Sequence, residues 1–290
     1  MNASAASAGI PQESREILGV RVDATNYERA TEQILAWASS GSSRYVSLCT
    51  VNQIMEARDS PGFAQVMHEA DLVTSDGMPL VWLLKRLGIP QAMRVYGPDL
   101  MPRVLHAAAQ RDIPVGFYGG SATVLDGLVK LASRNFPKLH VTYAESPPFR
   151  EVTPEEDERS MRDLIASGTR ILFVGIGSPK QELWMHAHRG RLRCVMIGVG
   201  AAFDFLTGAK PQAPLWMRRT GLEWFFRLST EPSRLWRRYL LQNPRFIALV
   251  AYELYLSAHV GRAFVPASWP SGRLKQPKKM PQRDHLLNKE

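Results

Sequence analysis

Short apolar runs alternate with amphipathic stretches along the first 210 residues of the chain. An alternating run at 17–22 predicts a strand of an edge hairpin. Buried strands are predicted at 45–49, 72–74, 115–118, 139–143, 171–174 and 195–199. Apolar residues at helical spacing occupy the intervals 26–39, 53–70, 80–87, 99–111, 122–135 and 154–166. Strands that alternate with helices of this length predict an α/β domain with a largely parallel sheet.

The pattern changes at Pro211. From Leu215 to Val260 the chain is rich in Trp, Leu and Arg and has no strand pattern, and Pro232 and Pro244 are expected to divide it into about three helices. We therefore expect four segments, which are a flexible N-terminus (1–14), an α/β core (15–210), a helical appendage (211–262) and a basic disordered tail (263–290).

The charge of the chain is concentrated at its C-terminal end. The net charge is +9, but residues 1–210 hold 22 basic and 22 acidic residues, whereas 211–262 hold eight Arg and three Glu. A neutral body with a basic end predicts that this end meets an anionic surface or ligand, although 263–290 is also typical of a solubilising tail. Two cysteines predict no disulfide framework, and neither a secretory signal nor a membrane-spanning segment is expected from the pattern of apolar residues.

Two glycine-rich segments, 171–184 and 195–208, each begin as an apolar run and end in small residues. This is typical of a buried parallel strand that opens into a loop at its carboxyl end, where ligands bind in open α/β sheets. The first loop places four polar residues at the start of a predicted helix, whose backbone N–H groups can hold an anion. These residues are Ser178, Lys180, Gln181 and Glu182. The pattern predicts one wall of a nucleotide or sugar-nucleotide site.

Eight sequence blocks, in one order, resemble the WecG/TagA/CpsF glycosyltransferases (family 26) over about residues 17–247. The blocks are Thr50-x-Asn52, Asp76-Gly77, Arg94-x-x-Gly97-x-Asp99, Phe117-Tyr-Gly-Gly120, Gly175-x-Gly-Ser-Pro-Lys-Gln-Glu182, Gly198-Val-Gly200 with Phe203-Asp204, Ala213-Pro214, and Gly221-Leu-Glu-Trp224 with Arg227-Leu and Glu231-Pro-x-x-Arg234. One position departs from the family pattern, because Gln212 stands where members often have an arginine.

The resemblance implies a Rossmann-like core with a C-terminal appendage that engages the membrane. It implies a cytoplasmic protein, peripheral on the cytoplasmic face of the inner membrane, that needs no cofactor or metal. The expected reaction is an inverting transfer from a UDP-sugar to an undecaprenyl-diphosphate-linked saccharide, in surface or exopolysaccharide biosynthesis. The donor sugars known in the family are N-acetylmannosamine, its uronic acid and glucose, and a homo-oligomer is also possible for this family.

An inverting transfer needs one positioned carboxylate that takes the proton of the attacking hydroxyl. Asp76 follows a short strand and precedes a glycine, so its side chain is expected to face the cleft, and the family motif supports the same residue. The alternative is that Asp76 caps the helix that starts near Pro79.

The UDP leaving group carries a diphosphate, yet the chain has no Asp-x-Asp pair to hold a metal. Its charge must then be stabilised by arginines, lysines or helix N-termini. The candidates in the appendage are Arg218, Arg227, Arg234 and Arg237, and meeting lipid phosphates is the alternative for each of them. Arginines together with Trp216, Trp224 and Trp236 are typical of a helix at a membrane interface, although ordinary core packing also explains such helices.

The other predicted binding residues have structural alternatives. Thr50 and Asn52 suit hydrogen bonds to sugar hydroxyls or a turn that caps the next helix. For uracil, ribose or sugar contacts we expect Gln181 and Glu182. The remaining candidates are Arg94 and Asp99, which suit donor binding or a structural salt bridge, and Asp204, which suits a ribose or base contact or a buried structural carboxylate. Cys49 adjoins Thr50, and we interpret it as a small buried residue rather than a nucleophile.

Two other classes of function compete with the transferase. A nucleotide-dependent oxidoreductase is compatible with the glycine-rich loops, but the full dinucleotide fingerprint and its acidic residue are missing. A nucleic-acid-binding protein would need a stacking or groove-reading module, and the sequence shows none. The sequence therefore favours a glycosyltransferase whose partners are a UDP-sugar, a polyprenyl-diphosphate-linked acceptor and an anionic membrane.

Overall fold

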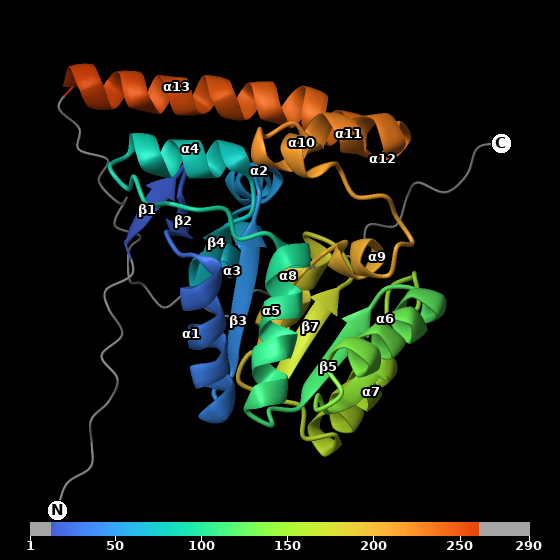
Figure 1. Ribbon diagram of the computed structural model, residues 1–290. Coiled ribbons are helices and arrows are strands. Elements are labelled where there is room, and N and C mark those ends of the chain that lie inside the picture. Colours follow the sequence, from blue (N-terminus) through green and yellow to red (C-terminus); the bar gives the residue numbers. More distant parts are fainter. Residues whose placement is uncertain (1–12, 261–290) are drawn as a thin grey trace, which may run out of the picture.

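The computed structural model describes residues 13–260 (Figure 1). The predicted tail at 263–290 lies outside the described residues. Most of the predicted flexible N-terminus (1–14) also lies outside them, and only Glu13 and Ser14 are described. Ser14 is the first residue of a strand.

Eight strands form one sheet in the order β1-β2-β4-β3-β8-β7-β5-β6. Strands β1 and β2 form an antiparallel hairpin at one edge, and every other pair of neighbours is parallel. The strands are β1 (Ser14–Ile17), β2 (Val20–Asp23), β3 (Arg44–Cys49), β4 (Leu72–Ser75), β5 (Val115–Gly119), β6 (Val141–Glu145), β7 (Ile171–Gly175) and β8 (Val195–Gly198). The predicted α/β class with a largely parallel sheet and an edge hairpin is confirmed. The single strand predicted over 17–22 is wrong, because the turn of the hairpin lies at Leu18 and Gly19, which both have positive φ angles.

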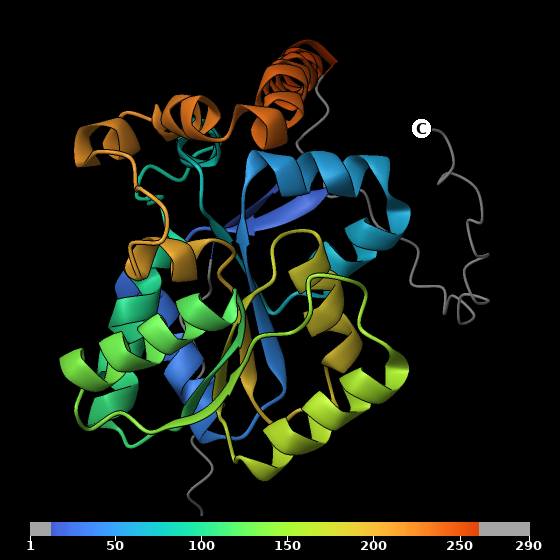
Figure 2. The ribbon, with the colours of Figure 1, turned by 90° about the vertical axis from the view of Figure 1, so that its right-hand side faces the viewer.

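Helices cover both faces of the sheet, and each face has its own hydrophobic core (Figure 2). One core is built with α1 (Tyr27–Ser39), α5 (Gly97–Gln110), α6 (Ala122–Asn135) and α9 (Ala202–Leu206). The other is built with α2 (Val51–Asp59), α3 (Pro61–Glu69), α4 (Met78–Arg86), α7 (Pro154–Ala166) and α8 (Lys180–His188). The inner strands β3, β4, β5, β7 and β8 are buried on both faces, which explains why they appear in the sequence as continuous apolar runs.

The single helix predicted over 53–70 is wrong, because the segment forms two helices, α2 and α3. Ser60 has extended backbone angles, as expected for a residue that precedes a proline, and its hydroxyl accepts a hydrogen bond from the Phe63 amide. Pro61 then occupies the first helical position, where its missing N–H group costs nothing. The break leaves α2 as a short helix that starts directly after β3.

The loops after β5 and β7 approach each other closely at two glycines. Gly119 has a φ of +125°, and a Cβ atom there would lie 2.5 Å from the Gly175 backbone. A Cβ atom on Gly175 would in turn lie 2.7 Å from the Phe203 ring. No side chain fits at either position, so the glycines of these two blocks are explained by the packing of the strand ends.

Residues 215–260 form a layer of helices over the carboxyl ends of β3 and β4 (Figures 1 and 2). The layer contains α10 (Leu215–Arg219), α11 (Glu223–Thr230), α12 (Pro232–Trp236), a π-helical segment η1 (Arg237–Gln242) and α13 (Asn243–Val260). As predicted, this part of the described chain contains no strand.

The predicted break at Pro244 is wrong, because the chain from Pro232 to Val260 continues without leaving a helical conformation. A proline inside an α-helix removes one i→i−4 hydrogen bond and clashes with the carbonyl four residues earlier. The wider turn of η1 ends at Gln242, two residues before Pro244, and changes the hydrogen-bond pattern where the clash would occur.

The long helix α13 packs on the α/β core through one side. Phe246 is buried in the same core cluster as the β1–β2 hairpin and α2, and Leu249, Val250 and Leu254 pack against that cluster. The opposite side is exposed, with Ile247 at 66%. Within the described range 13–260, no helix is both long and apolar enough to cross a membrane.

Candidate active site

A pocket lies between the carboxyl ends of β3 and β4 and the helical layer above them. The core side contributes Thr50, Val51, Asn52, Asp76, Gly77, Met78, Pro79, Arg94 and Tyr96. The helical layer contributes Gly221, Glu223, Trp224, Arg227, Arg238, Tyr239 and Asn243. The pocket is therefore built jointly by the core and the appendage, and it holds five of the predicted site residues.

Thr50 is the N-cap of α2 and also lines the pocket. Its backbone N–H and its hydroxyl donate to Gln53 Oε1 over 2.7 and 2.9 Å. From the appendage, Arg238 Nη2 donates to Thr50 Oγ1 over 3.0 Å. The capping and binding interpretations of Thr50 are therefore compatible, because the cap fixes a hydroxyl at the pocket wall.

Asp76 directly follows β4, and its backbone N–H donates to the Cys49 carbonyl over 2.8 Å. Helix α4 begins at Met78 with Gly77 as its N-cap, so Asp76 does not cap that helix. The Asp76 side chain keeps 18% of its surface accessible, through the pocket. The loop thus presents a carboxylate whose backbone is fixed by the neighbouring strand.

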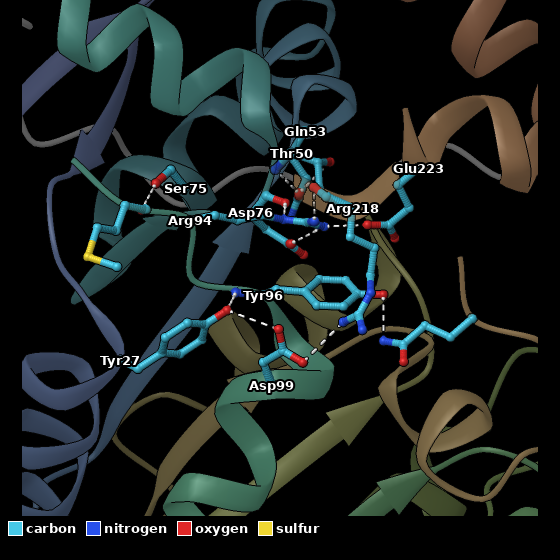
Figure 3. Close-up of polar contacts among 12 residues, drawn as sticks. Tyr27, Thr50, Gln53, Ser75, Asp76, Arg94, Tyr96, Asp99, Arg218 and Glu223 are labelled. Carbon is cyan, nitrogen blue, oxygen red and sulfur yellow. Dashed lines mark hydrogen bonds and ion pairs between the residues drawn. The ribbon is translucent and has the colours of Figure 1, made fainter. Parts of the chain in front are cut away.

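Arg94 joins Asp76 to the appendage (Figure 3). Its Nε donates to the Asp76 carbonyl over 2.8 Å, and its Nη2 lies 3.4 Å from Asp76 Oδ1. The same Nη2 donates to Glu223 Oε2 over 2.7 Å, and Nη1 donates to the Arg218 carbonyl over 3.4 Å. The guanidinium also lies over the Tyr96 ring, 4.1 Å from its centroid. These contacts hold one cation between two carboxylates.

The environment of Asp76 raises the pKa of its carboxyl to about 7. Burial is the largest cause, the Arg94 charge opposes it, the Glu223 charge adds to it, and Arg227 opposes it again. A carboxyl group that titrates near neutral pH can accept a proton at physiological pH and is a stronger base than an ordinary aspartate. This is the protonation behaviour that a general base requires.

The predicted arginines separate into two groups. Arg227 lines the pocket, with its guanidinium 5.7 Å from the Phe205 ring centroid. The other three do not line the pocket. Arg218 contacts Asp99 over 3.3 Å, Arg234 pairs with Glu231 over 2.6 Å, and Arg237 lies over the Trp236 ring. Arg238, the neighbour of Arg237, is the second arginine that the appendage contributes to the pocket.

Gln181 and Glu182 do not reach this pocket, because both side chains are buried beneath it, at 3% and 0% exposure. Glu182 Oε1 accepts hydrogen bonds of 2.8 Å from Gln53 and from Gln181, and Gln181 Oε1 accepts one of 3.0 Å from the Gly200 amide. Burial raises the pKa of the Glu182 carboxyl. Gln181 and Glu182 therefore connect α2, α8 and the loop after β8. In this arrangement they make structural hydrogen bonds, and they do not face the pocket where a substrate contact was expected.

Asp99 and Asp204 also lie outside the pocket. Asp99 accepts from the Tyr27 hydroxyl over 3.3 Å and pairs with Arg218, so the structural alternative describes it. Asp204 pairs with Lys210 over 3.2 Å. Cys49 is fully buried, as predicted, and burial raises the pKa of its thiol.

Several pocket residues were missed by the sequence interpretation. Tyr96 lies inside the Arg94-x-x-Gly97 block, and Glu223 and Trp224 lie inside the Gly221–Trp224 block, so the blocks contained a signal that residue type alone did not resolve. Arg238 and Tyr239 had no such signal. Among residues 13–260, no three His, Cys, Asp or Glu side chains are grouped to hold a metal ion, and the expected metal independence stays a prediction.

Comparison with known proteins gives one family and several relatives. The family described as "Glycosyl transferase WecG/TagA/CpsF family" matches residues 15–259. A protein of Bacillus spizizenii named N-acetylglucosaminyldiphosphoundecaprenol N-acetyl-beta-D-mannosaminyltransferase is 33% identical over 198 residues, which cover 67% of this chain and 74% of the relative. A Staphylococcus aureus protein of the same name is 27% identical over 239 residues, 81% of this chain and 91% of the relative.

The raised pKa of Asp76 predicts a measurable dependence of stability on pH. In the unfolded chain this carboxyl titrates near pH ~3.9, so the fold retains the proton up to about pH 7 and the wild type loses stability as the pH rises between these values. The Asp76→Asn variant lacks this loss. Its stability relative to wild type should increase by roughly 4 kcal/mol across that window and stay constant above it.

Urea unfolding at a series of pH values measures this difference. A difference that does not change between about pH 4 and pH 7 would contradict the raised pKa.

Proposed function

The chain belongs to the WecG/TagA/CpsF family of glycosyl transferases and is a hexosyltransferase, and we propose that it moves N-acetylmannosamine from UDP to an undecaprenyl-diphosphate-linked N-acetylglucosamine. The names of both relatives support this donor and acceptor, with the uronic acid and glucose as the other donors to test. The observation that carries the proposal is Asp76, a carboxyl with a pKa of about 7 in a pocket that also holds three arginines.

In the proposed reaction the acceptor hydroxyl attacks the anomeric carbon as the bond to the UDP oxygen breaks. Asp76 accepts the hydroxyl proton, and the configuration at the anomeric carbon inverts because attack and departure occur on opposite sides. Thr50 and Asn52 line the same wall of the pocket and suit hydrogen bonds to sugar hydroxyls. The fixed loop geometry around Asp76 places the base before substrate arrives, which lowers the cost of reaching the transition state.

Arg227 and Arg238 suit the negative charge that develops on the diphosphate. Arg238 has the clearer geometry, since its Nη2 already contacts Thr50 and no carboxylate of the described chain lies within ion-pair distance of it. Arginine donors in a partly dehydrated pocket can stabilise this charge without a metal ion. The diphosphate in question belongs to the departing UDP, so these residues should affect turnover more than acceptor affinity.

The outer surface of the appendage suits a membrane that contains the lipid-linked acceptor. Many of its large apolar side chains are exposed, namely Leu215, Trp216, Leu222, Phe225, Trp236, Leu240, Leu241, Ile247, Tyr252 and Tyr255. Trp82 of α4, next to Gly221, extends the set. Apolar side chains mixed with arginines favour an anionic lipid surface. We propose a peripheral position on the cytoplasmic face of the inner membrane, and the predicted homo-oligomer stays a prediction.

A donor panel tests the proposed reaction. Purified protein, a polyprenyl-diphosphate-linked N-acetylglucosamine with a short prenyl chain, and EDTA are combined with UDP-N-acetylmannosamine, its uronic acid or UDP-glucose, and UDP release is measured. We expect release with UDP-N-acetylmannosamine, and a loss of kcat of about 100-fold or more in Asp76→Asn with UDP-sugar binding retained. No release from any donor, with or without anionic vesicles, would contradict the function, and wild-type turnover in Asp76→Asn would remove the base assignment.

Neighbouring arginines provide a matched test of the diphosphate site. We expect Arg238→Ala to lower kcat by about 100-fold, the typical cost of losing one donor to a developing anion. The control is Arg237→Ala, which removes the same charge one residue earlier, outside the pocket, and should stay within about 3-fold of wild type in kcat. Equal losses in the two variants would contradict a specific role for Arg238.

Vesicle flotation tests the membrane surface. The double variant Trp216→Ser with Ile247→Ser should bind anionic vesicles at least 10-fold more weakly, since about 25 cal/mol is lost for each Å² of apolar surface that leaves the membrane. Ile165→Ser is the control, because Ile165 is 58% exposed on α7, far from α13 (Figure 1). Equal binding by all three proteins would remove the appendage surface as the membrane contact.

A further inference from the structure

Glu223 is an acidic residue that the appendage places inside the pocket. It is the first residue of α11 and is buried at 9% exposure. Its Oε2 accepts a hydrogen bond of 2.7 Å from Arg94 Nη2. An acidic side chain close to a diphosphate is unfavourable for substrate binding, so its place in a pocket rich in arginine calls for another role.

The two carboxylates compete for one nitrogen. Arg94 Nη2 lies 2.7 Å from Glu223 and 3.4 Å from Asp76, so the short charge-assisted bond is made with the appendage. Arg94 Nε is meanwhile fixed on the Asp76 carbonyl, which prevents the guanidinium from leaving Asp76 altogether. Without Glu223, Nη2 would be free to close on Asp76 Oδ1, where it would occupy an oxygen lone pair and favour the charged form.

We propose that Glu223 is a positioning residue for the proposed transfer: by holding Arg94 Nη2 2.7 Å from its own carboxylate and 3.4 Å from Asp76 Oδ1, it leaves the Asp76 carboxylate able to accept the hydroxyl proton. The inference rests on the proposed function for its catalytic meaning, but the competition for Arg94 is a property of the protein without substrate. It assigns the appendage a role inside the reaction, in addition to the lipid surface proposed above.

Other charged and titratable groups also surround Asp76 and act in both wild type and variants. They are Arg94 and Tyr96 from the segment before α5, Glu223 and Arg227 from α11, Arg238 from η1, Cys49 at the end of β3 and Tyr27 from α1. Of these, Glu223 is the acidic group, and its charge raises the pKa of Asp76. Removal of the Glu223 charge should therefore lower the pKa of Asp76, whereas removal of any of the arginine charges should raise it.

The first test uses stability and needs no substrate. The free energy of unfolding is measured against pH for wild type and for each Glu223 or Glu231 variant, both with Asp76 intact and with Asp76→Asn added. Within each pair, the difference in unfolding free energy stops changing above the pKa of Asp76 in the folded protein, and we call this pH the levelling point. Glu223→Gln should move this levelling point at least one pH unit below its wild-type value of about 7. Glu223→Asp, which keeps the charge on a shorter side chain, should move it less and guards against a variant that fails to fold.

Glu231→Gln is the matched control, because Glu231 also lies in the appendage and pairs with Arg234 and Lys210 outside the pocket. It should leave the levelling point unchanged. An unchanged point in Glu223→Gln would overturn the proposal, as would an equal shift in Glu231→Gln.

The second test uses the pH profile of kcat/KM in the donor assay. Glu223→Gln should shift the acid limb to lower pH by the same amount as the levelling point and lower the plateau, because a weaker base accepts the proton less readily. A higher KM with no shift of the acid limb would overturn the proposal and make Glu223 a substrate-binding residue. If wild type transfers no sugar, the proposed function fails, whereas the stability titration still decides whether Glu223 controls Asp76.

Discussion

The guanidinium of Arg94 is the interaction on which the pocket depends. It binds the backbone and the carboxylate of Asp76 on one side, and Glu223 and the Arg218 carbonyl on the other (Figure 3). A buried charge is costly unless its hydrogen bonds are satisfied, and here they are satisfied only when the core and the appendage are both in place. Docking of the appendage and organisation of the loop after β4 are therefore coupled through one side chain.

The same constraint explains why two opposite requirements coexist. The transfer needs a carboxylate basic enough to accept a proton and cations strong enough to stabilise a departing diphosphate. In a partly buried pocket, where the dielectric constant is low, these groups attract each other strongly and would pair if they were free to move. In this pocket Arg94 is shared between Asp76 and Glu223, while Arg227 and Arg238 approach from separate helical turns of the appendage. Rigid positions maintain the separation that free side chains would lose.

Most of the fold was predictable, because continuous apolar runs and helical periodicity directly reflect burial on a sheet covered on both faces. The core side of the pocket was predictable for the same reason, since Thr50, Asn52 and Asp76 follow strands whose ends must meet at one edge. The residues that the sequence interpretation misplaced or missed are those whose positions depend on contacts between distant segments. Gln181 and Glu182 bind Gln53 and the Gly200 amide, and no local pattern distinguishes such a buried network from a substrate contact. Arg238 was missed because the helical phase after Trp236 depends on a π-helical turn that leaves no simple mark in the sequence.

That π-helical turn has a consequence for how this sequence can change. Successive residues of an α-helix are separated by about 100° around its axis. In a regular helix, the loss of one residue would rotate everything after it by that angle. A π-helical turn instead holds one residue more than an α-helical turn, so loss of one residue between Arg237 and Gln242 would restore a regular helix and leave α13 in nearly its present orientation. Phe246 could then keep its place in the core. A length change of one residue is therefore expected to be tolerated in η1 and excluded from the regular turns of α13.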